Sequence, residues 1–312
     1  MITNFNQFMR LNEGGAAIKS SRRIREDESE KTLNHIQDTL FPLLGGGNFD
    51  EDFLLIGSLG KKKNPTDDSG DIDLGISKEF LMDQLGSTSE TVLSDLDEFL
   101  HENLPQILGF EPEMKLMQGL KVLSIGWPIE GDPSKGIVQL DLIPISDMNW
   151  AKFIYYSPDY KKDESAYKSA HRNWLFQAIL SALKEVESVD DEGNIMDYEG
   201  YVLRLSDGIY KSKKSYRGIK KNRLSRPQTI EGTLKFITND PQESINLMFG
   251  PGVRPDEVKT FEDAWSLVTS PNFKHKDKLP EIVEDLVRYL EKAKLVIPSE
   301  VEAKQKDLLD DF

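Results

Sequence analysis

Three aspartates in this sequence have the residue type and the spacing of metal ligands. Asp71 and Asp73 lie one residue apart in the segment SGDIDL, residues 69–74. Side chains on a strand alternate between its two faces, so both carboxylates point to one side while Ile72 points to the core. Two like charges this close are costly unless a cation lies between them, and carboxylate oxygens suit hard ions such as Mg²⁺ or Mn²⁺.

The third candidate ligand is Asp141. It lies in IVQLDLIPI, residues 137–145, a short apolar run with one charge where a buried strand normally carries none. A lone acid in such a strand needs a partner, and Asp71 and Asp73 can supply it. The three carboxylates together would complete a site for two metal ions.

An apolar strand and a turn precede the acidic pair. The sequence FLLI, residues 53–56, is followed directly by Gly57 and Ser58. This turn and the three aspartates resemble the catalytic core of the DNA polymerase beta-like nucleotidyltransferase superfamily, over residues 50–175. The resemblance implies that the three aspartates are catalytic and hold two Mg²⁺ or Mn²⁺ ions, which activate an attacking hydroxyl and stabilise the leaving pyrophosphate.

The resemblance also implies contacts to the nucleotide. The turn at Gly57 and Ser58 would begin a short helix whose free backbone N–H groups receive the triphosphate, as helix N-termini do for anions. Lys61 stands where many members carry a cation for the triphosphate. Tyr155 and Tyr156 stand where paired aromatics lie beside the nucleotide sugar. Alternatively, Lys61 is an ordinary solvated lysine and the two tyrosines are core or rim aromatics.

The composition excludes several other kinds of chemistry. The 312 residues include no cysteine, which rules out a disulfide framework and a thiolate nucleophile. The four histidines show no zinc-ligand spacing. No apolar run approaches the roughly 20 residues that span a bilayer, and the first residues lack the pattern of a secretion signal. We therefore expect a cytoplasmic protein with no membrane partner.

The net charge of −15 is distributed unevenly along the chain. Residues 1–150 contain twice as many Asp and Glu as Lys and Arg, whereas the rest is close to balance. Half of the residues in segment 211–226 are basic, and none is acidic. Such a patch suits the phosphate backbone of RNA or DNA, although a solvated loop that balances the acidic half has the same composition. The candidate nucleic-acid contacts are Lys211, Lys213, Lys214, Arg217, Lys220, Lys221 and Arg223.

The sequence pattern predicts an α+β protein with an N-terminal tail and two domains. The tail covers residues 1–25, and a nucleotidyltransferase α/β domain with a small mixed sheet follows at 26–150. Within it, Ser87 and Glu90 have the spacing of a capping box and predict the start of a helix. The C-terminal domain, 151–312, is expected to be mainly helical with a β-hairpin near 189–211.

The N-terminal residues carry a second resemblance. Phe5 and Phe8, followed by Leu11 and Glu13, resemble the amphipathic leader of internal head proteins in large tailed bacteriophages. That leader is removed by a maturation protease after a Leu-x-Glu sequence. The resemblance implies a protein of the host cytoplasm or of the virion head that loses residues 1–13. The alternative is an ordinary chain end, either frayed or docked through its two phenylalanines.

These observations predict a metal-dependent nucleotidyltransferase that moves a nucleoside monophosphate from an NTP, such as ATP, to an acceptor hydroxyl. The basic patch favours the 3′ end of a polynucleotide as the acceptor. Two alternatives stay open. One is transfer to a small molecule or a protein, and the other is a nucleotide-binding or virion protein that keeps the fold without the chemistry.

Overall fold

The computed structural model describes residues 17–119, 121–192, 194–216 and 228–310. The chain divides into two compact units, residues 1–166 and 167–312. The division falls after the predicted position because helix α5 (Met148–Ile154) belongs to the first unit, where the Lys152 ammonium group donates to the Asp50 carbonyl oxygen at 2.7 Å. Both units contain helices and sheet, so the α+β class is confirmed.

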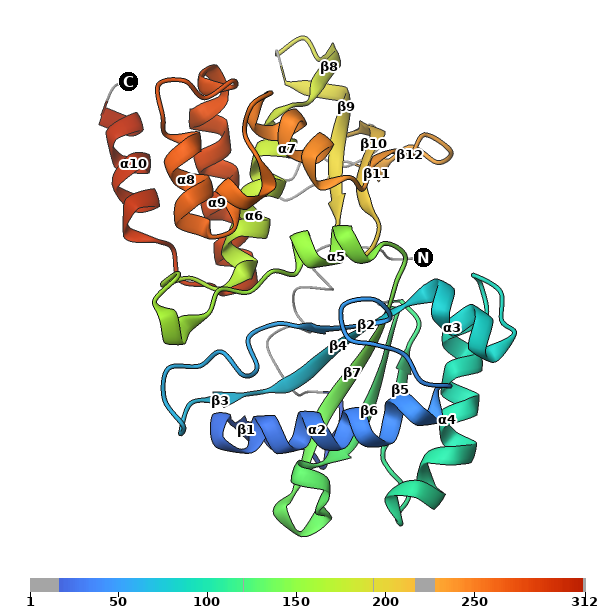
Figure 1. Ribbon diagram of the computed structural model, residues 1–312. Coiled ribbons are helices and arrows are strands. Elements are labelled where there is room, and N and C mark those ends of the chain that lie inside the picture. Colours follow the sequence, from blue (N-terminus) through green and yellow to red (C-terminus); the bar gives the residue numbers. More distant parts are fainter. Residues whose placement is uncertain (1–16, 120, 193, 217–227, 311–312) are drawn as a thin grey trace. The chain divides into compact units, whose positions relative to one another are not determined.

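A five-stranded mixed sheet forms the centre of the first unit (Figure 1). Its strands follow the order β2-β4-β7-β6-β5. Only the central pair β4 and β7 is parallel, and the other neighbours are antiparallel. The strands are β2 (Phe53–Ile56), β4 (Asp71–Ser77), β7 (Ile137–Ile145), β6 (Val122–Pro128) and β5 (Met114–Met117).

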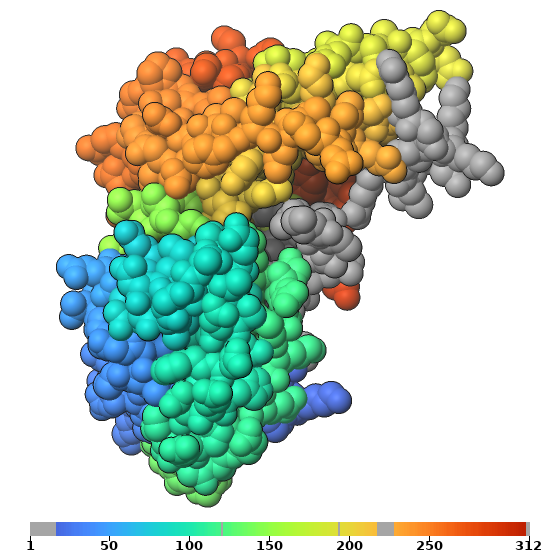
Figure 2. All heavy atoms as spheres, turned by 90° about the vertical axis from the view of Figure 1, so that its right-hand side faces the viewer, coloured from blue at the N-terminus to red at the C-terminus, as the bar shows by residue number. Residues whose placement is uncertain are grey.

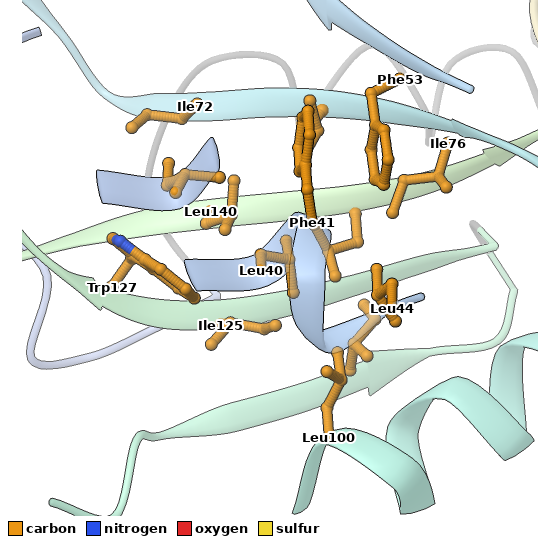
Figure 3. Packing of buried hydrophobic residues seen from close by; sticks show 14 of the residues in the cluster. Leu40, Phe41, Leu44, Phe53, Ile72, Ile76, Leu100, Ile125, Trp127 and Leu140 are labelled. Carbon is orange, nitrogen blue, oxygen red and sulfur yellow. The ribbon is translucent and has the colours of Figure 1, made fainter. Parts of the chain in front are cut away.

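Helices α2 (Glu26–Leu43) and α4 (Val92–Leu108) bury the apolar face of this sheet. Figure 3 shows Leu40 of α2 and Leu100 of α4 packed with side chains from the strands. The short helix α3 (Lys78–Leu85) packs on α4, and Figure 2 shows the face of the unit that these two helices form. The predicted capping box is wrong, because α4 begins at Val92 and its N-cap is Thr91.

Alternation along the two parallel strands separates an apolar face from a polar one. On β4, Ile72, Leu74 and Ile76 are buried in the core cluster, and on β7 Leu140 and its alternate neighbours are buried in the same cluster. The intervening residues therefore point to the opposite face of the sheet. These intervening residues include all three aspartates identified above.

The predicted tail is partly built into the first unit. Strand β1 (Ile24–Arg25) pairs with β3 (Asp68–Ser69) in a small antiparallel sheet. Residues 17–22 also make hydrogen bonds to other residues of the first unit. Residues 1–16, which include the leader-like segment, lie outside the described residues.

The second unit contains a larger sheet than the predicted hairpin. Strands β8, β9 and β10 are antiparallel neighbours, and β11 and β12 both pair with β10. These strands are β8 (Glu185–Val189), β9 (Ile195–Arg204), β10 (Gly208–Ser215), β11 (Gln228–Thr229) and β12 (Lys235–Thr238). The helices are α6 (Ser169–Ala182), α7 (Pro241–Phe249), α8 (Phe261–Val268), α9 (Leu279–Ala293) and α10 (Ser299–Asp310). In the described part of the chain, no helix combines the length and apolar character needed to cross a bilayer.

Truncating Ile125 should show how strongly the core holds the first unit together. This side chain on β6 is fully buried, so Ile125→Ala should lower the free energy of unfolding by about 2–5 kcal/mol through lost transfer energy and a residual cavity. The matched control is Ile107→Ala on α4, where the side chain is 49% exposed and the expected change is within about 0.5 kcal/mol. Urea denaturation of both variants measures the difference, and equal losses would contradict this account of the core.

Candidate metal centre

The structure brings Asp71, Asp73 and Asp141 together on the polar face of the sheet. In the parallel pairing of β4 and β7, Asp73 lies opposite Asp141 and Asp71 lies opposite Gln139. One carboxylate oxygen of each aspartate lies within 4.8 Å of the others. Residues 70 positions apart in the sequence thus form one acidic cluster, as the sequence predicted.

Burial and mutual repulsion make this cluster costly for the protein. Burial of the Asp73 carboxyl group, with the negative charges of Asp71 and Asp141 beside it, raises its pKa well above the usual value. Burial also raises the pKa of Asp141, but hydrogen bonds from Ser124 and Gln139 oppose this shift. Asp73 therefore resists ionisation more than an exposed aspartate does, and a bound cation would relieve this penalty.

Two polar residues that the sequence analysis missed hold Asp141. The Ser124 hydroxyl on β6 donates to Asp141 Oδ1 at 2.5 Å, and Gln139 Nε2 donates to both carboxylate oxygens at 3.0 Å. Both residues are almost completely buried. The signal was present in the sequence, because each is a polar residue inside an apolar strand and Gln139 shares a face with Asp141.

Gly57 lies against the acidic cluster at the end of β2. Its φ of +83° is in the left-handed region, and a Cβ built on it would lie 3.3 Å from Asp73 Oδ2. The helix expected after Ser58 is absent from the structure. A turn closed by Lys61 N–H donating to the Ser58 carbonyl oxygen takes its place, and Gly60 with a φ of +78° follows Leu59 within that turn. Two left-handed residues this close are incompatible with a helix.

Lys61 is half-buried in a loop that is fastened to the segment after α5. Its ammonium group donates to the Ser157 carbonyl oxygen at 2.8 Å and lies 5.6 Å from the Tyr156 ring centre. Burial lowers the pKa of Lys61, partly offset by the nearby acids Asp159 and Glu164. The lysine is thus held by the protein and is not the freely solvated side chain of the alternative interpretation.

The two candidate sugar contacts occupy different environments. Tyr155 caps the end of α5 and is buried, which agrees with a core aromatic. Tyr156 is half-buried, and its hydroxyl donates to Glu164 Oε2 at 2.7 Å. Tyr156 and Lys61 are therefore neighbours, whereas the ring of Tyr155 belongs to the packed interior.

The described part of the basic patch lies on β10 beside acidic strands. Lys211 pairs with Glu185 on β8 and Glu199 on β9, at 3.0 and 2.8 Å. Lys213 pairs with Glu187 at 2.6 Å. Burial lowers the pKa of Lys214, whose ammonium group lies 5.7 Å from the ring centre of Tyr198. The remaining candidates, Arg217, Lys220, Lys221 and Arg223, lie outside the described residues.

The acidic cluster has the donor set of a hard divalent cation. Its three carboxylates supply oxygen ligands, which suit hard divalent cations generally. The hydrogen bonds to Asp141 resemble the outer partners that orient ligands in metal sites generally. No family model, curated protein or solved structure matches this chain.

Replacing Asp73 with Asn should stabilise the metal-free protein at neutral pH. Because folding raises the pKa of Asp73, the unfolded chain releases this proton at a lower pH than the folded protein does. The free energy of unfolding therefore falls as the pH rises from about 3.9 through the raised pKa, and Asp73→Asn removes that loss. In EDTA the variant should have a higher Tm than wild type at pH 7, with the difference shrinking towards pH 4. Asp83→Asn, at an exposed position on α3, should match wild type at both pH values. An equal Tm difference between Asp73→Asn and wild type at pH 7 and pH 4 would refute this explanation.

Gly57→Ala and Gly60→Ala form a matched pair for the metal site. Both residues have a positive φ, so each substitution should cost about 1–2 kcal/mol of stability through backbone strain. Only the Cβ at position 57 approaches Asp73, because a Cβ at position 60 has no heavy atom within 4 Å apart from those of its own residue and its two chain neighbours. We expect weaker Mn²⁺ binding in Gly57→Ala alone, measured by isothermal titration calorimetry. Equal losses in both variants would show that loop strain, rather than the contact with Asp73, sets the affinity.

Proposed function

We propose that this protein is a metal-dependent nucleotidyltransferase, which moves a nucleoside monophosphate from an NTP to a hydroxyl group and releases pyrophosphate. One observation carries the proposal. Three carboxylates from parallel neighbouring strands converge on one face of a sheet, next to the glycine turn that ends β2. This cluster has little value for stability, because one of its three like charges is buried, the other two are half-buried, and all three repel one another.

The residues of this cluster divide the work of the reaction. Asp71, Asp73 and Asp141 would hold two Mg²⁺ or Mn²⁺ ions. Such ions supply positive charge to the triphosphate and lower the pKa of the acceptor hydroxyl. Asp141, which hydrogen bonds from Ser124 and Gln139 hold in place, would also accept the proton of that hydroxyl.

The turn after β2 supplies the proposed contacts to the triphosphate. Backbone N–H groups at Gly57 and Ser58 can donate to phosphate oxygens, and the absence of a side chain at Gly57 leaves room beside Asp73. Lys61 adds a positive charge, held in place by Ser157. Tyr156, next to Lys61, is the better candidate for the sugar contact, because Tyr155 is buried.

For the acceptor we propose the 3′ end of a polynucleotide, supported by the run of basic residues at 211–226. Transfer to a small molecule or a protein is the second candidate. The ion pairs of Lys211 and Lys213 favour it, because paired lysines release few counterions from a nucleic acid. A polynucleotide acceptor therefore depends on the basic residues beyond β10.

Asp73→Asn should abolish nucleotide transfer while the protein stays folded. The loss should reach at least about 10²–10³-fold, the scale of removing a central charge-stabilising group. The assay incubates the protein with each labelled NTP, Mn²⁺ or Mg²⁺, and separate pools of RNA, DNA, small molecules and proteins. Asp83→Asn is the control for loss of a carboxylate at an exposed position and should retain full activity.

The products of this assay identify the acceptor. Labelling of RNA or DNA that decreases steeply as the salt concentration rises would support a polynucleotide acceptor. Labelling of the small-molecule or protein pool would support the second candidate acceptor. Full activity of Asp73→Asn would overturn the proposed function. Specific NTP binding without transfer to any pool would instead indicate a nucleotide-binding protein with this fold.

A further inference from the structure

A chain of hydrogen bonds connects the N-terminal part of the described chain to the acidic cluster. The backbone N–H groups of Ala17 and Ile18 donate to Gln139 Oε1 at 2.9 and 3.1 Å. From the other end of the same amide, Gln139 Nε2 donates to both oxygens of Asp141 at 3.0 Å. Backbone groups more than 120 positions away in sequence thus reach the third carboxylate through one side chain.

These contacts fix the orientation of the Gln139 amide. An amide side chain accepts at its oxygen and donates at its nitrogen, so the two ends are not interchangeable. The flipped amide would set its oxygen against the Asp141 carboxylate and leave the N–H groups of Ala17 and Ile18 facing another donor. All four residues are buried, so no bulk water would satisfy the displaced groups.

The segment 17–22, which we call the N-terminal strap, is anchored independently of Gln139. Lys19 and Ser20 donate backbone N–H groups to Glu113, at 3.1 and 3.2 Å. The Arg22 N–H donates to the Ile137 carbonyl oxygen at 2.8 Å, at the start of the strand that carries Asp141. The Arg22 guanidinium group binds both oxygens of Glu28 on α2, at 3.0 and 2.6 Å. These anchors hold the two critical N–H groups against Gln139.

We propose that Gln139 is a positioning residue for Asp141, and that the N-terminal strap sets the metal affinity of the acidic cluster by locking the Gln139 amide. This inference rests on the metal site of the proposed function. It adds that the N-terminal strap, which precedes β1, contributes to the metal affinity of that site. Without the hydrogen bonds of the Gln139 amide, the Asp141 carboxylate can rotate away from the orientation that a cation requires.

Mn²⁺ titration of the full-length protein tests this role without any nucleotide. Gln139→Met keeps the side-chain length but removes both hydrogen-bonding ends, and it should weaken Mn²⁺ binding by about 10–100-fold. Ala17→Pro removes one N–H donor of the strap and should weaken binding in the same direction. The control is Ser94→Ala on α4, which removes an exposed hydrogen bond to the Thr91 carbonyl oxygen and no contact of the strap or of Gln139, so it should leave the Mn²⁺ affinity unchanged.

A double-mutant cycle separates this role from general destabilisation. If the strap acts through Gln139, Ala17→Pro should have no further effect on Mn²⁺ affinity in the Gln139→Met background. Additive losses would overturn the inference, and so would wild-type affinity in Gln139→Met. Gln139→Asn, with an amide too short to bridge both partners, provides a second variant should the methionine impair folding, which circular dichroism monitors.

The same titration distinguishes this inference from the proposed function. Absence of Mn²⁺ binding in the wild-type protein would overturn the inference together with the metal site. Mn²⁺ binding that depends on Gln139, in a protein that transfers no nucleotide to any acceptor, would support the inference and overturn only the proposed function.

Discussion

Parallel pairing of β4 with β7 is the constraint on which the first unit depends. It sets Asp73 opposite Asp141, where like charges repel and the burial of Asp141 and partial burial of Asp73 reduce their screening by water. The strands cannot slip to relieve the repulsion. A shift of β4 by one residue would turn the fully buried Ile72 onto the polar face and point the carboxylates of Asp71 and Asp73 into the core. Packing of the apolar face therefore fixes the register of the strands and keeps the carboxylates close together on the polar face, despite their repulsion.

The protein relieves this cost unevenly among the three acids. Asp141 accepts hydrogen bonds from Ser124 and Gln139, which favour its ionised form. At Asp73 burial dominates, reinforced by the charges of its neighbours, and the adjoining residue is Gly57, which has no side chain. The Asp141 carboxylate is thus held by hydrogen bonds, whereas the Asp73 carboxylate lies next to a glycine backbone with no side chain. Such an arrangement suits a site where a ligand completes the charge balance.

The sequence predicted the parts of this site that follow from local alternation. Asp71, Asp73 and Asp141 interrupt apolar strands, so their shared face could be inferred before the structure. The turn after β2 could not, because its conformation depends on the left-handed residues Gly57 and Gly60 and on contacts to the distant segment after α5. Likewise, a capping-box spacing does not determine where a helix begins when the following residues form a separate turn first, as they do before Val92.

The run of basic residues was the least informative signal in the sequence. The sequence of one segment does not show which acidic residues lie opposite it on neighbouring strands. Glu185 and Glu199 lie directly opposite each other on β8 and β9, an arrangement that is unfavourable by itself. Lys211 on β10 bridges both carboxylates, and Lys213 pairs with a single carboxylate, that of Glu187. These lysines therefore offset negative charge on the neighbouring strands. A cation already engaged by two carboxylates gains little from a phosphate, since it must first give up those pairs. Two of the seven candidate nucleic-acid contacts, Lys211 and Lys213, thus contribute to the sheet's own charge balance.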